Sequence, residues 1–215
     1  MEAKKILKLN KEIIFLYIIF FVGIIGHIYP PFQKMMIAIT PITLLLTGFI
    51  VLYFSYKTSE NNFLLWVVLT FIITFILEVT GVKTGSIFGS YSYGSTLGFK
   101  LFEVPLIIGF NWVLVILGSI SFSKLITNNV FISSIISAII AFIFDLILEP
   151  IAIKLDYWTW AGVVIPIQNY IAWFSIAFLS ALAFNYLKIN ITSKISMHYL
   201  LVQYLFFIVL LIFYR

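Results

Sequence analysis

The stretch that decides the fold is VFISSIISAIIAFIFDLILEP, residues 130–150. Residues 130–148 are long and apolar enough to cross a bilayer core, which takes about 20 residues of helix. Asp145 and Glu149 stand at the end of this apolar run. An ionisable side chain at membrane depth is costly, so it points to a function by default. The stretch predicts a transmembrane helix that carries functional acids.

Similar apolar segments recur along the whole chain. The 215 residues are 63% hydrophobic and 10% charged, and their mean hydropathy of +1.15 is far above that of a soluble domain. Polar or Gly/Pro-containing stretches separate the segments. We therefore expect an all-α, polytopic helical bundle that forms one transmembrane domain over residues 1–215. The predicted spans are residues 13–27, 36–56, 63–80, 104–122, 130–148, 167–187 and 197–214.

The composition also excludes several classes of function. The chain has no Cys, so disulfides and thiolate metal sites are excluded, and its two histidines argue against a His-rich metal site. Its 13 basic residues form no tract interleaved with aromatics, which argues against nucleic-acid binding. The net charge of +5 fits loops that lie against anionic lipid headgroups. Membrane lipid is therefore an expected partner.

The basic residues also predict the orientation in the cell membrane. If the N-terminus is cytoplasmic, the inner tail and loops hold eight basic residues and the outer ones hold five. The positive-inside rule then favours a cytoplasmic N-terminus and an external C-terminus. The first apolar run follows several lysines and is not followed by a small-residue cleavage site, so we interpret it as an uncleaved span.

Alternation of the spans places five of the eight acidic residues at one membrane face. Ordinary helix-end residues in the headgroup zone would explain some of them. Asp145 and Glu149, however, are four residues apart on one helix face within strongly apolar sequence. We therefore expect a functional cluster of acids. The five residues are Glu78, Glu103, Asp145, Glu149 and Asp156.

Helix ends suggest different roles for these carboxyls. Glu78, Asp145 and Glu149 come at the C-terminal ends of predicted spans, where the helix dipole disfavours an anion, so we expect them to be neutral proton donors. Glu103 comes at an N-terminal end, with Pro105 in the first turn, so its anion is favoured. Glu103 is thus the expected base or water-positioning group. Acid–base chemistry at neutral pH requires one protonated and one ionised carboxyl of this kind.

Two loops on the same face are rich in glycine and aromatic residues. The first, residues 81–94, contains Tyr91 and Tyr93 and suggests a tightly folded lid. The second contains Trp158 and Trp160 and leads toward Asn169 and Trp173. These aromatics form either an interfacial belt or a mouth that receives an apolar ligand and shields a cation with π-faces. The glycine spacing matches no nucleotide-binding fingerprint.

Two neighbouring residues of the fourth span add to this picture. Asn111 lies eight residues after Glu103 and thus roughly on the same helix face, where it would orient that carboxylate or a water, or make a helix-packing hydrogen bond. Trp112 is expected to pack in the bundle beside the substrate. His27, at the end of the first span, is expected to be an interfacial or hydrogen-bonded residue.

Several spaced motifs resemble the CruF-type carotenoid biosynthesis family. They are EVTGVKTGSIFGSYSY at residues 78–93, the pairs at 97–98 and 104–105, DLILEP at 145–150, WTW at 158–160, Pro166, Asn169 and Trp173. The resemblance covers about residues 75–173. Members of this family are integral membrane carotenoid 1,2-hydratases, including the bisanhydrobacterioruberin hydratases. The resemblance thus implies a carotenoid substrate, no metal, nucleotide or redox cofactor, and other enzymes of the carotenoid pathway as partners.

The implied reaction adds water to the C1–C2 double bond of an acyclic ψ-end group. A carboxylic acid would protonate C2, neighbouring groups would stabilise the tertiary cation at C1, and bound water would capture it. Asp145 and Glu78 are the leading candidates for the acid, Glu149 would share the proton, and Glu103 or Asn169 would handle the water. The expected substrate-binding residues are Tyr91, Tyr93, Asn111, Trp112, Trp158, Trp160, Asn169 and Trp173.

Three other functions remain open on the sequence alone. A membrane lycopene-type cyclase would form the same cation but capture it with an internal alkene. A proton-coupled transporter would also use intramembrane carboxylates, but it predicts acids staggered through the membrane and helices broken at mid-depth. A structural scaffold would leave the buried Asp145 and Glu149 pair unexplained.

Overall fold

The computed structural model describes residues 10–60, 62–162 and 164–214. Within these ranges the chain forms seven helices, each long and apolar enough to cross a membrane. The all-α bundle is thus confirmed, and the protein is a multi-pass membrane protein. Several residues that enter the orientation prediction lie outside the described ranges, so the orientation stays a prediction. They are Lys4, Lys5, Lys8 and Arg215.

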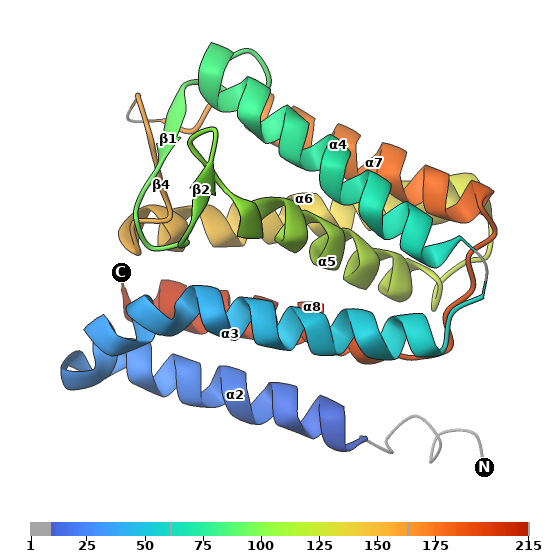
Figure 1. Ribbon diagram of the computed structural model, residues 1–215, viewed down its shortest axis with the longest axis horizontal. Helices are drawn as coiled ribbons and strands as arrows, with labels where there is room; N and C mark the ends of the chain where they lie inside the picture. Colours follow the sequence, from blue (N-terminus) through green and yellow to red (C-terminus); the bar gives the residue numbers. More distant parts are fainter. Residues whose placement is uncertain (1–9, 61, 163, 215) are drawn as a thin grey trace.

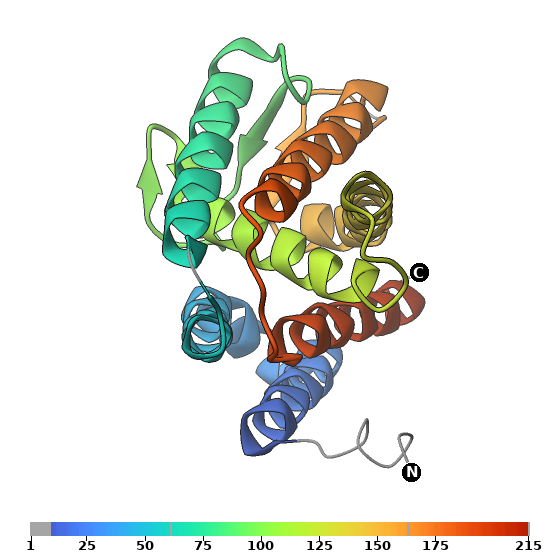
Figure 2. The same ribbon diagram turned by 90° about the vertical axis from the view of Figure 1, so that its right-hand side faces the viewer.

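The helices are arranged in two layers (Figure 1). One layer contains α2 (Lys11–Ile28), α3 (Pro30–Lys57) and α8 (Ile195–Phe213), which contact one another. The other contains α4 (Phe63–Thr84), α5 (Leu106–Ser123), α6 (Val130–Lys154) and α7 (Ile167–Tyr186). Figure 2 shows the two layers from the side of the bundle at which the helices are seen roughly from their ends. Helix α5 contacts α3 and α8 of the first layer as well as α4, α6 and α7, so it is the central helix of the bundle.

Local sequence explains where several of these helices begin and end. Prolines occupy the first turn of α3, where a missing N–H costs nothing. The Asn129 side chain accepts hydrogen bonds from the N–H groups of Phe131 and Ile132 and so caps α6. Helix α4 ends at Gly85, whose φ of 66° is a left-handed conformation that glycine adopts without strain. These signals define the ends of the helices that hold the site.

Close packing joins the two layers at Gly118 of α5. A Cβ atom at this position would lie 2.6 Å from the Cβ of Leu200 in α8 and 2.8 Å from the carbonyl oxygen of Ser196. Only a residue without a side chain allows the backbones to approach this closely, as is common between membrane helices. Gly118 therefore fixes the distance between the central helix and α8.

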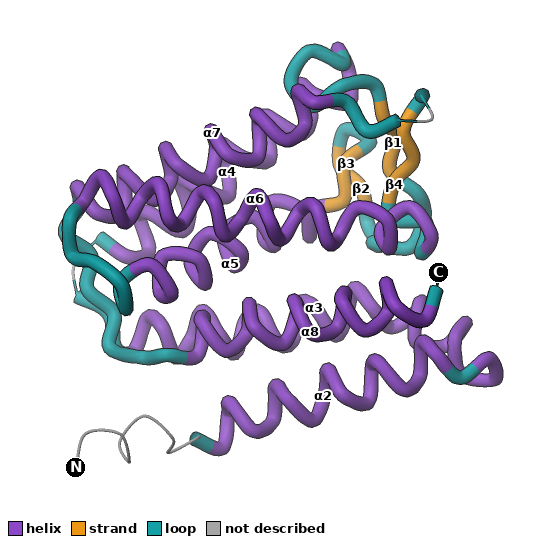
Figure 3. Tube along the Cα trace, turned by 180° about the vertical axis from the view of Figure 1, so that it is seen from behind, coloured by secondary structure: helices purple, strands orange, loops and turns teal. Residues whose placement is uncertain are grey.

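Short strands connect the helices at one end of the bundle (Figure 3). Strand β1 (Tyr91–Tyr93) pairs antiparallel with β4 (Trp158–Trp160), so that Tyr91 lies opposite Trp160 and Tyr93 opposite Trp158. Strands β2 (Lys100–Leu101) and β3 (Val104–Pro105) form a hairpin directly before α5. The two aromatic loops are thus parts of one ordered structure that joins α4 and α5 to α6 and α7.

The structure corrects four helix boundaries, one of which is the start of α3, at Pro30 rather than residue 36. Helix α4 continues to Thr84 rather than residue 80, and α6 continues through Pro150 to Lys154 rather than ending at residue 148. Helix α5 begins at Leu106, because residues 100–105 form the hairpin instead of a helical turn. Charged and glycine-containing sequence therefore extends two of the helices beyond the apolar run that predicted them.

Candidate active site

A cavity of about 190 Å³ lies between the two helix layers. Its wall is mostly aliphatic and aromatic, and side chains from all seven helices and from β1 and β4 contribute to it. The structure brings ten of the twelve sequence-predicted site residues to this one cavity. They are Glu78, Tyr91, Tyr93, Asn111, Trp112, Glu149, Trp158, Trp160, Asn169 and Trp173.

Glu78 of α4 is part of the cavity wall, and both of its carboxylate oxygens accept hydrogen bonds. Its side chain is only 5% exposed. Oε2 accepts hydrogen bonds from the hydroxyls of Tyr91 at 2.5 Å and Tyr93 at 2.6 Å, and Oε1 accepts one from Nε1 of Trp112 at 2.7 Å. All three partners donate, and their donor–acceptor distances are in the short range typical of bonds to an ionised carboxylate.

The two phenols are suited to remain donors. Burial, followed by the negative charge of Glu78, raises the pKa of Tyr91 above its ordinary value of 10.0, and the same two causes raise the pKa of Tyr93. Both hydroxyls therefore keep their protons throughout the neutral range. They lie two residues apart on β1, so both side chains point to the same face of the strand.

Glu149 of α6 is held in the same manner by the partner strand. Its side chain is 1% exposed, and Oε2 accepts hydrogen bonds from Nε1 of Trp158 and of Trp160, both at 3.0 Å. These tryptophans are also two residues apart, on β4. The pairing of β1 with β4 thus presents two phenols to Glu78 and two indoles to Glu149 from one ribbon. The YSY and WTW sequences encode this arrangement through the two-residue period of a strand.

Asp145 of α6 lies one helical turn before Glu149, and behind it as seen from the cavity. It is completely buried and does not border the cavity. Its Oδ2 accepts a hydrogen bond from Nδ2 of Asn169 at 2.8 Å, and the same nitrogen is 3.3 Å from Oε1 of Glu149. Oδ1 is buried and has no hydrogen-bond partner among the described residues. Asn169 of α7 therefore links the two carboxyls.

The carboxyl cluster has no compensating cation in the described ranges. Only other carboxyls act as charged neighbours of Asp145, and the same holds for Glu149. Glu78, Asp145 and Glu149 are all buried. Several adjacent buried carboxylates cannot all be ionised without a cation, because the repulsion and the loss of solvation are too costly. The cluster therefore retains at least one proton.

Aromatic faces border the cavity beside the carboxylates. The rings of Trp112 and Trp173 stack with their centroids 3.8 Å apart and their planes inclined by 26°. Tyr91 packs against Trp160 with a centroid distance of 5.2 Å. Such π-faces attract a cation in a site from which water is largely excluded.

Two expectations about the acids are wrong. Glu103 does not begin a helix: it is exposed in the turn of the β2–β3 hairpin, with a φ of 69°, and does not border the cavity. Asn111 therefore cannot orient it within the cavity. The helix-end argument also fails for Glu78, Asp145 and Glu149. Their helices continue to Thr84 and Lys154, and the dipole acts only within the last turn.

Asp156 likewise lies outside the cluster. Its side chain is exposed, and Oδ2 accepts hydrogen bonds from the backbone N–H of Ser95 at 3.0 Å and from the Ser95 hydroxyl at 3.1 Å. It ties the segment after β1 to the segment before β4. Of the five acids expected at this face, three are thus buried together and two are surface residues.

The cavity also contains polar residues that the sequence analysis did not assign to it. His27 of α2, Thr40 of α3, Tyr157 and Gln203 of α8 all border it. Gln203 could have been singled out from the sequence, because it is the one amide side chain in the last predicted span. The first two spans and the last match the family motifs only in being apolar, so none of their polar residues was expected in the site. His27 was expected to be interfacial or hydrogen-bonded, and its Nδ1 does form a hydrogen bond of 2.7 Å with the carbonyl oxygen of Gly23.

Comparison with known proteins gives one match. No curated protein and no solved structure matches the chain. A family model described as carotenoid biosynthesis protein matches residues 39–214, which includes six of the seven helices in whole or in large part. This match agrees with the resemblance seen in the sequence motifs and extends it to most of the chain. The protein therefore belongs to the carotenoid biosynthesis protein family.

Proposed function

We propose that the protein is a carotenoid hydratase that adds water to the C1–C2 double bond of an acyclic ψ-end group. The observation that carries the proposal is the pair of carboxyls, Glu78 and Glu149, on the wall of an otherwise apolar and aromatic cavity in a membrane protein of this family. An apolar cavity suits the hydrocarbon end group, and carboxyls supply the acid that the addition of water to an alkene requires.

The shape of the substrate supports a site within the membrane. A ψ-end group is a branched alkene at the end of a long polyene, and the cavity lies between apolar helices that are long enough to span the bilayer. The polyene can stay among lipid chains while only its end enters the cavity. The enzyme then has no need to extract the whole molecule into water, which would be costly for so apolar a chain.

Glu149 is the proton donor in this proposal. It borders the cavity. Within the described part of the chain its Oε1 has only the long hydrogen bond from Asn169, whereas Oε2 accepts one from each of the two indoles. Oε1 is thus the oxygen free to carry a proton and present it to the substrate. Asp145 is the positioning residue behind it: it shares Asn169 with Glu149, and its proximity favours a neutral Glu149.

Glu78 is the anion that stabilises the cation. Its three donors, Tyr91, Tyr93 and Trp112, hold it in place before the reaction begins, so no reorganisation is needed when charge develops. The stacked rings of Trp112 and Trp173 add π-faces to the same wall. An anion and aromatic faces in a poorly solvated cavity together favour a tertiary carbocation.

The steps balance without an oxidant or reductant. The π-electrons of the C1–C2 bond take the proton of Glu149, so a C2–H bond forms and C1 becomes a tertiary cation. The oxygen of a water molecule then bonds to C1, and the water proton returns to the carboxylate of Glu149. The product is a tertiary alcohol, and the carboxyl cluster has regained its initial protonation state.

Expression in a host that accumulates an acyclic carotene tests this function. We expect a new carotenoid that is heavier by one water and carries a tertiary hydroxyl at C1. The Glu149→Gln variant should give none of it, while Asp156→Asn, which changes an exposed acid at the same end, should give the normal amount. A new product of unchanged mass with a terminal ring would instead indicate a cyclase, and an unchanged carotenoid profile would refute the proposal.

A further inference from the structure

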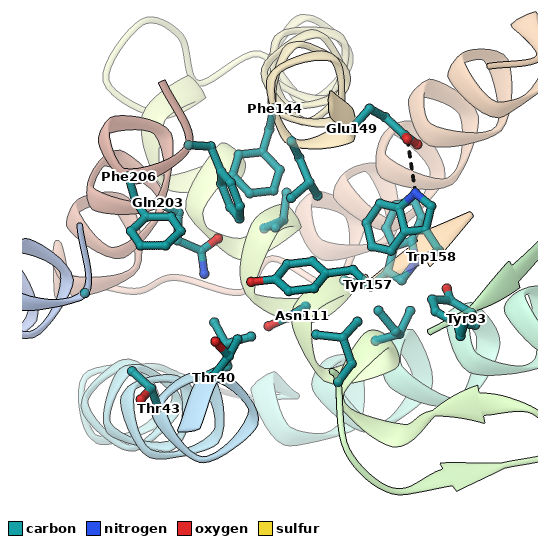
Figure 4. Close-up of a pocket in the computed structure, with 18 of the residues that line it drawn as sticks. Thr40, Thr43, Tyr93, Asn111, Phe144, Glu149, Tyr157, Trp158, Gln203 and Phe206 are labelled. Atoms are coloured by element: carbon teal, nitrogen blue, oxygen red, sulfur yellow. Dashed lines mark hydrogen bonds between the residues drawn. The ribbon is translucent and has the colours of Figure 1, made fainter. Parts of the chain in front are cut away.

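A second polar group borders the cavity on the side away from Glu149. Its members come from four separate elements: Thr40 from α3, Asn111 from α5, Tyr157 from the turn after α6, and Gln203 from α8. Figure 4 shows the Tyr157 hydroxyl pointing into the space between the other three, while Glu149 lies across the cavity beside Trp158. Polar side chains from four elements are thus directed at one small volume.

Thr40, Tyr157 and Gln203 are buried and Asn111 is half-buried, and one atom of Asn111 lacks a protein partner. The carboxamide oxygen of Asn111 is buried and accepts no hydrogen bond within the described part of the chain. Gln203 and Tyr157 are each 4% exposed. Burial raises the pKa of Tyr157, so its hydroxyl keeps its proton and, beside its contact with Thr40, can still bond a further polar molecule. A buried acceptor without a partner in a native structure calls for a bound polar molecule.

Water is the molecule that fits this position. A buried water needs space for about one probe sphere and two to four polar partners. The cavity of about 190 Å³ supplies the space, and Asn111, Tyr157, Gln203 and Thr40 supply acceptors and donors. The carboxylates elsewhere on the wall already accept hydrogen bonds from their own donors. Nε2 of His27 also borders the cavity without a partner among the described residues, but it is a single group on α2 rather than part of this four-element set.

We propose that Asn111, Tyr157 and Gln203 bind the water that captures the C1 cation. This inference rests on the proposed function and adds the source of the nucleophile. Asn111 accepts a hydrogen bond from the water and thereby aims its lone pair toward C1, while Tyr157 and Gln203 fix its position. The water thus attacks from the wall opposite the acid. After the O–C1 bond has formed, a second water takes the surplus proton from the new hydroxyl and delivers it to the ionised Glu149.

The distinguishing property of this site is that it acts after protonation. A cation that finds no water loses a proton from C2 or from a neighbouring methyl group and returns to the alkene. In deuterium oxide, this return leaves deuterium in the recovered carotene. Loss of the water site should therefore slow hydration while protonation, and hence deuterium exchange, continues.

The experiment uses the full-length protein purified in lipid nanodiscs, with an acyclic carotene in deuterium oxide. Tyr157→Phe and Asn111→Leu each remove polar atoms and keep approximate size. We expect each to lower hydration by about tenfold and to raise the ratio of deuterium exchange to hydration by at least about tenfold, as loss of a hydrogen bond in the capture step predicts. Tyr204→Phe is the control, because it removes a hydroxyl that, among the described residues, bonds only to the carbonyl of Ile140, outside the cavity.

The outcomes separate the two proposals. If hydration and exchange fall together in both variants while each protein stays monodisperse, or if neither quantity changes, the water site is refuted and the hydratase proposal stands. If the wild-type protein neither hydrates nor exchanges the carotene, the proposed function itself fails and the water site with it. Two variants from different elements ensure that misfolding of one does not decide the result.

Discussion

Replacement of Glu149 by Gln separates the chemistry of the site from its stability. Gln keeps the size of the side chain, and its single carbonyl oxygen can accept both indole hydrogen bonds that Oε2 accepts at 3.0 Å. Its amide group then replaces Oε1 and faces Nδ2 of Asn169, which is also a donor and lies 3.3 Å away. The substitution therefore removes one long hydrogen bond and the transferable proton.

These losses differ greatly in magnitude. Loss of one neutral hydrogen bond costs about 1 kcal/mol of stability, which lowers the melting temperature by only a few degrees. A positioned general acid contributes roughly 100-fold to 10,000-fold in rate. We therefore expect the hydration rate to fall by about 1,000-fold, equivalent to about 4 kcal/mol in the barrier at 1.4 kcal/mol for each factor of ten.

The assay measures formation of the tertiary alcohol by purified protein in nanodiscs, alongside thermal unfolding of the same sample. Asp156→Asn is the matched control, since it makes the same carboxyl-to-amide change at an exposed position and keeps an oxygen for Ser95. A Glu149→Gln protein that retains more than about a tenth of the wild-type rate would refute the assignment of the donor, because no positioned acid contributes so little.

Three further predictions concern other parts of the molecule. Glu78→Gln should lower the hydration rate by about 100-fold, since it removes the anion that stabilises the cation, and a change of less than tenfold would contradict this role. Spectrophotometric titration should show that at least three of the 12 tyrosines stay protonated at pH ~11 in the folded protein and ionise on unfolding. These three are Tyr91, Tyr93 and Tyr157. The free energy of unfolding should therefore fall as the pH rises above about 10. Titration of all 12 tyrosines before unfolding would be inconsistent with their burial. Gly118→Ala should destabilise the fold by about 1–3 kcal/mol through contact with Leu200, whereas Gly162→Ala, which meets no atom closer than 3.8 Å, should have little effect on the melting temperature.

The fold was predictable from the sequence because the apolar segments are long enough to cross a bilayer. Each of the seven predicted spans overlaps one helix, because a helix satisfies all of its backbone groups within a single apolar segment. The boundaries were less predictable where polar residues extend a helix, as in α6, which runs through Glu149 and Pro150. The hairpin before α5 was missed because its residues, including Glu103, directly precede an apolar run and fit the first turn of a helix equally well.

The site was predictable as a set of residues but not as a set of contacts. The spacing of Asp145 and Glu149 on one helix face correctly placed them together, and the YSY and WTW sequences marked residues that reach the cavity. Which donor would hold which carboxyl depended on the register of β1 against β4. That register joins segments more than 60 residues apart, and no local pattern specifies it.

The place of the polar residues of α3 and α8 in the site could not be predicted from local sequence either. Thr40 and Gln203 lie in apolar spans, where a single polar side chain is equally compatible with a hydrogen bond between helices. Their position across the cavity from Glu149 follows only from the packing of one helix layer on the other (Figure 4).

The measurement that tests the central claim most directly is the mass of the product formed by the purified protein from an acyclic carotene in oxygen-18 water. The carboxyl cavity should protonate the end group and let water capture the cation, so the product should contain one oxygen-18 atom, located in a hydroxyl at C1. A product of unchanged mass, or a hydroxylated product that lacks the oxygen-18 label, would contradict this mechanism.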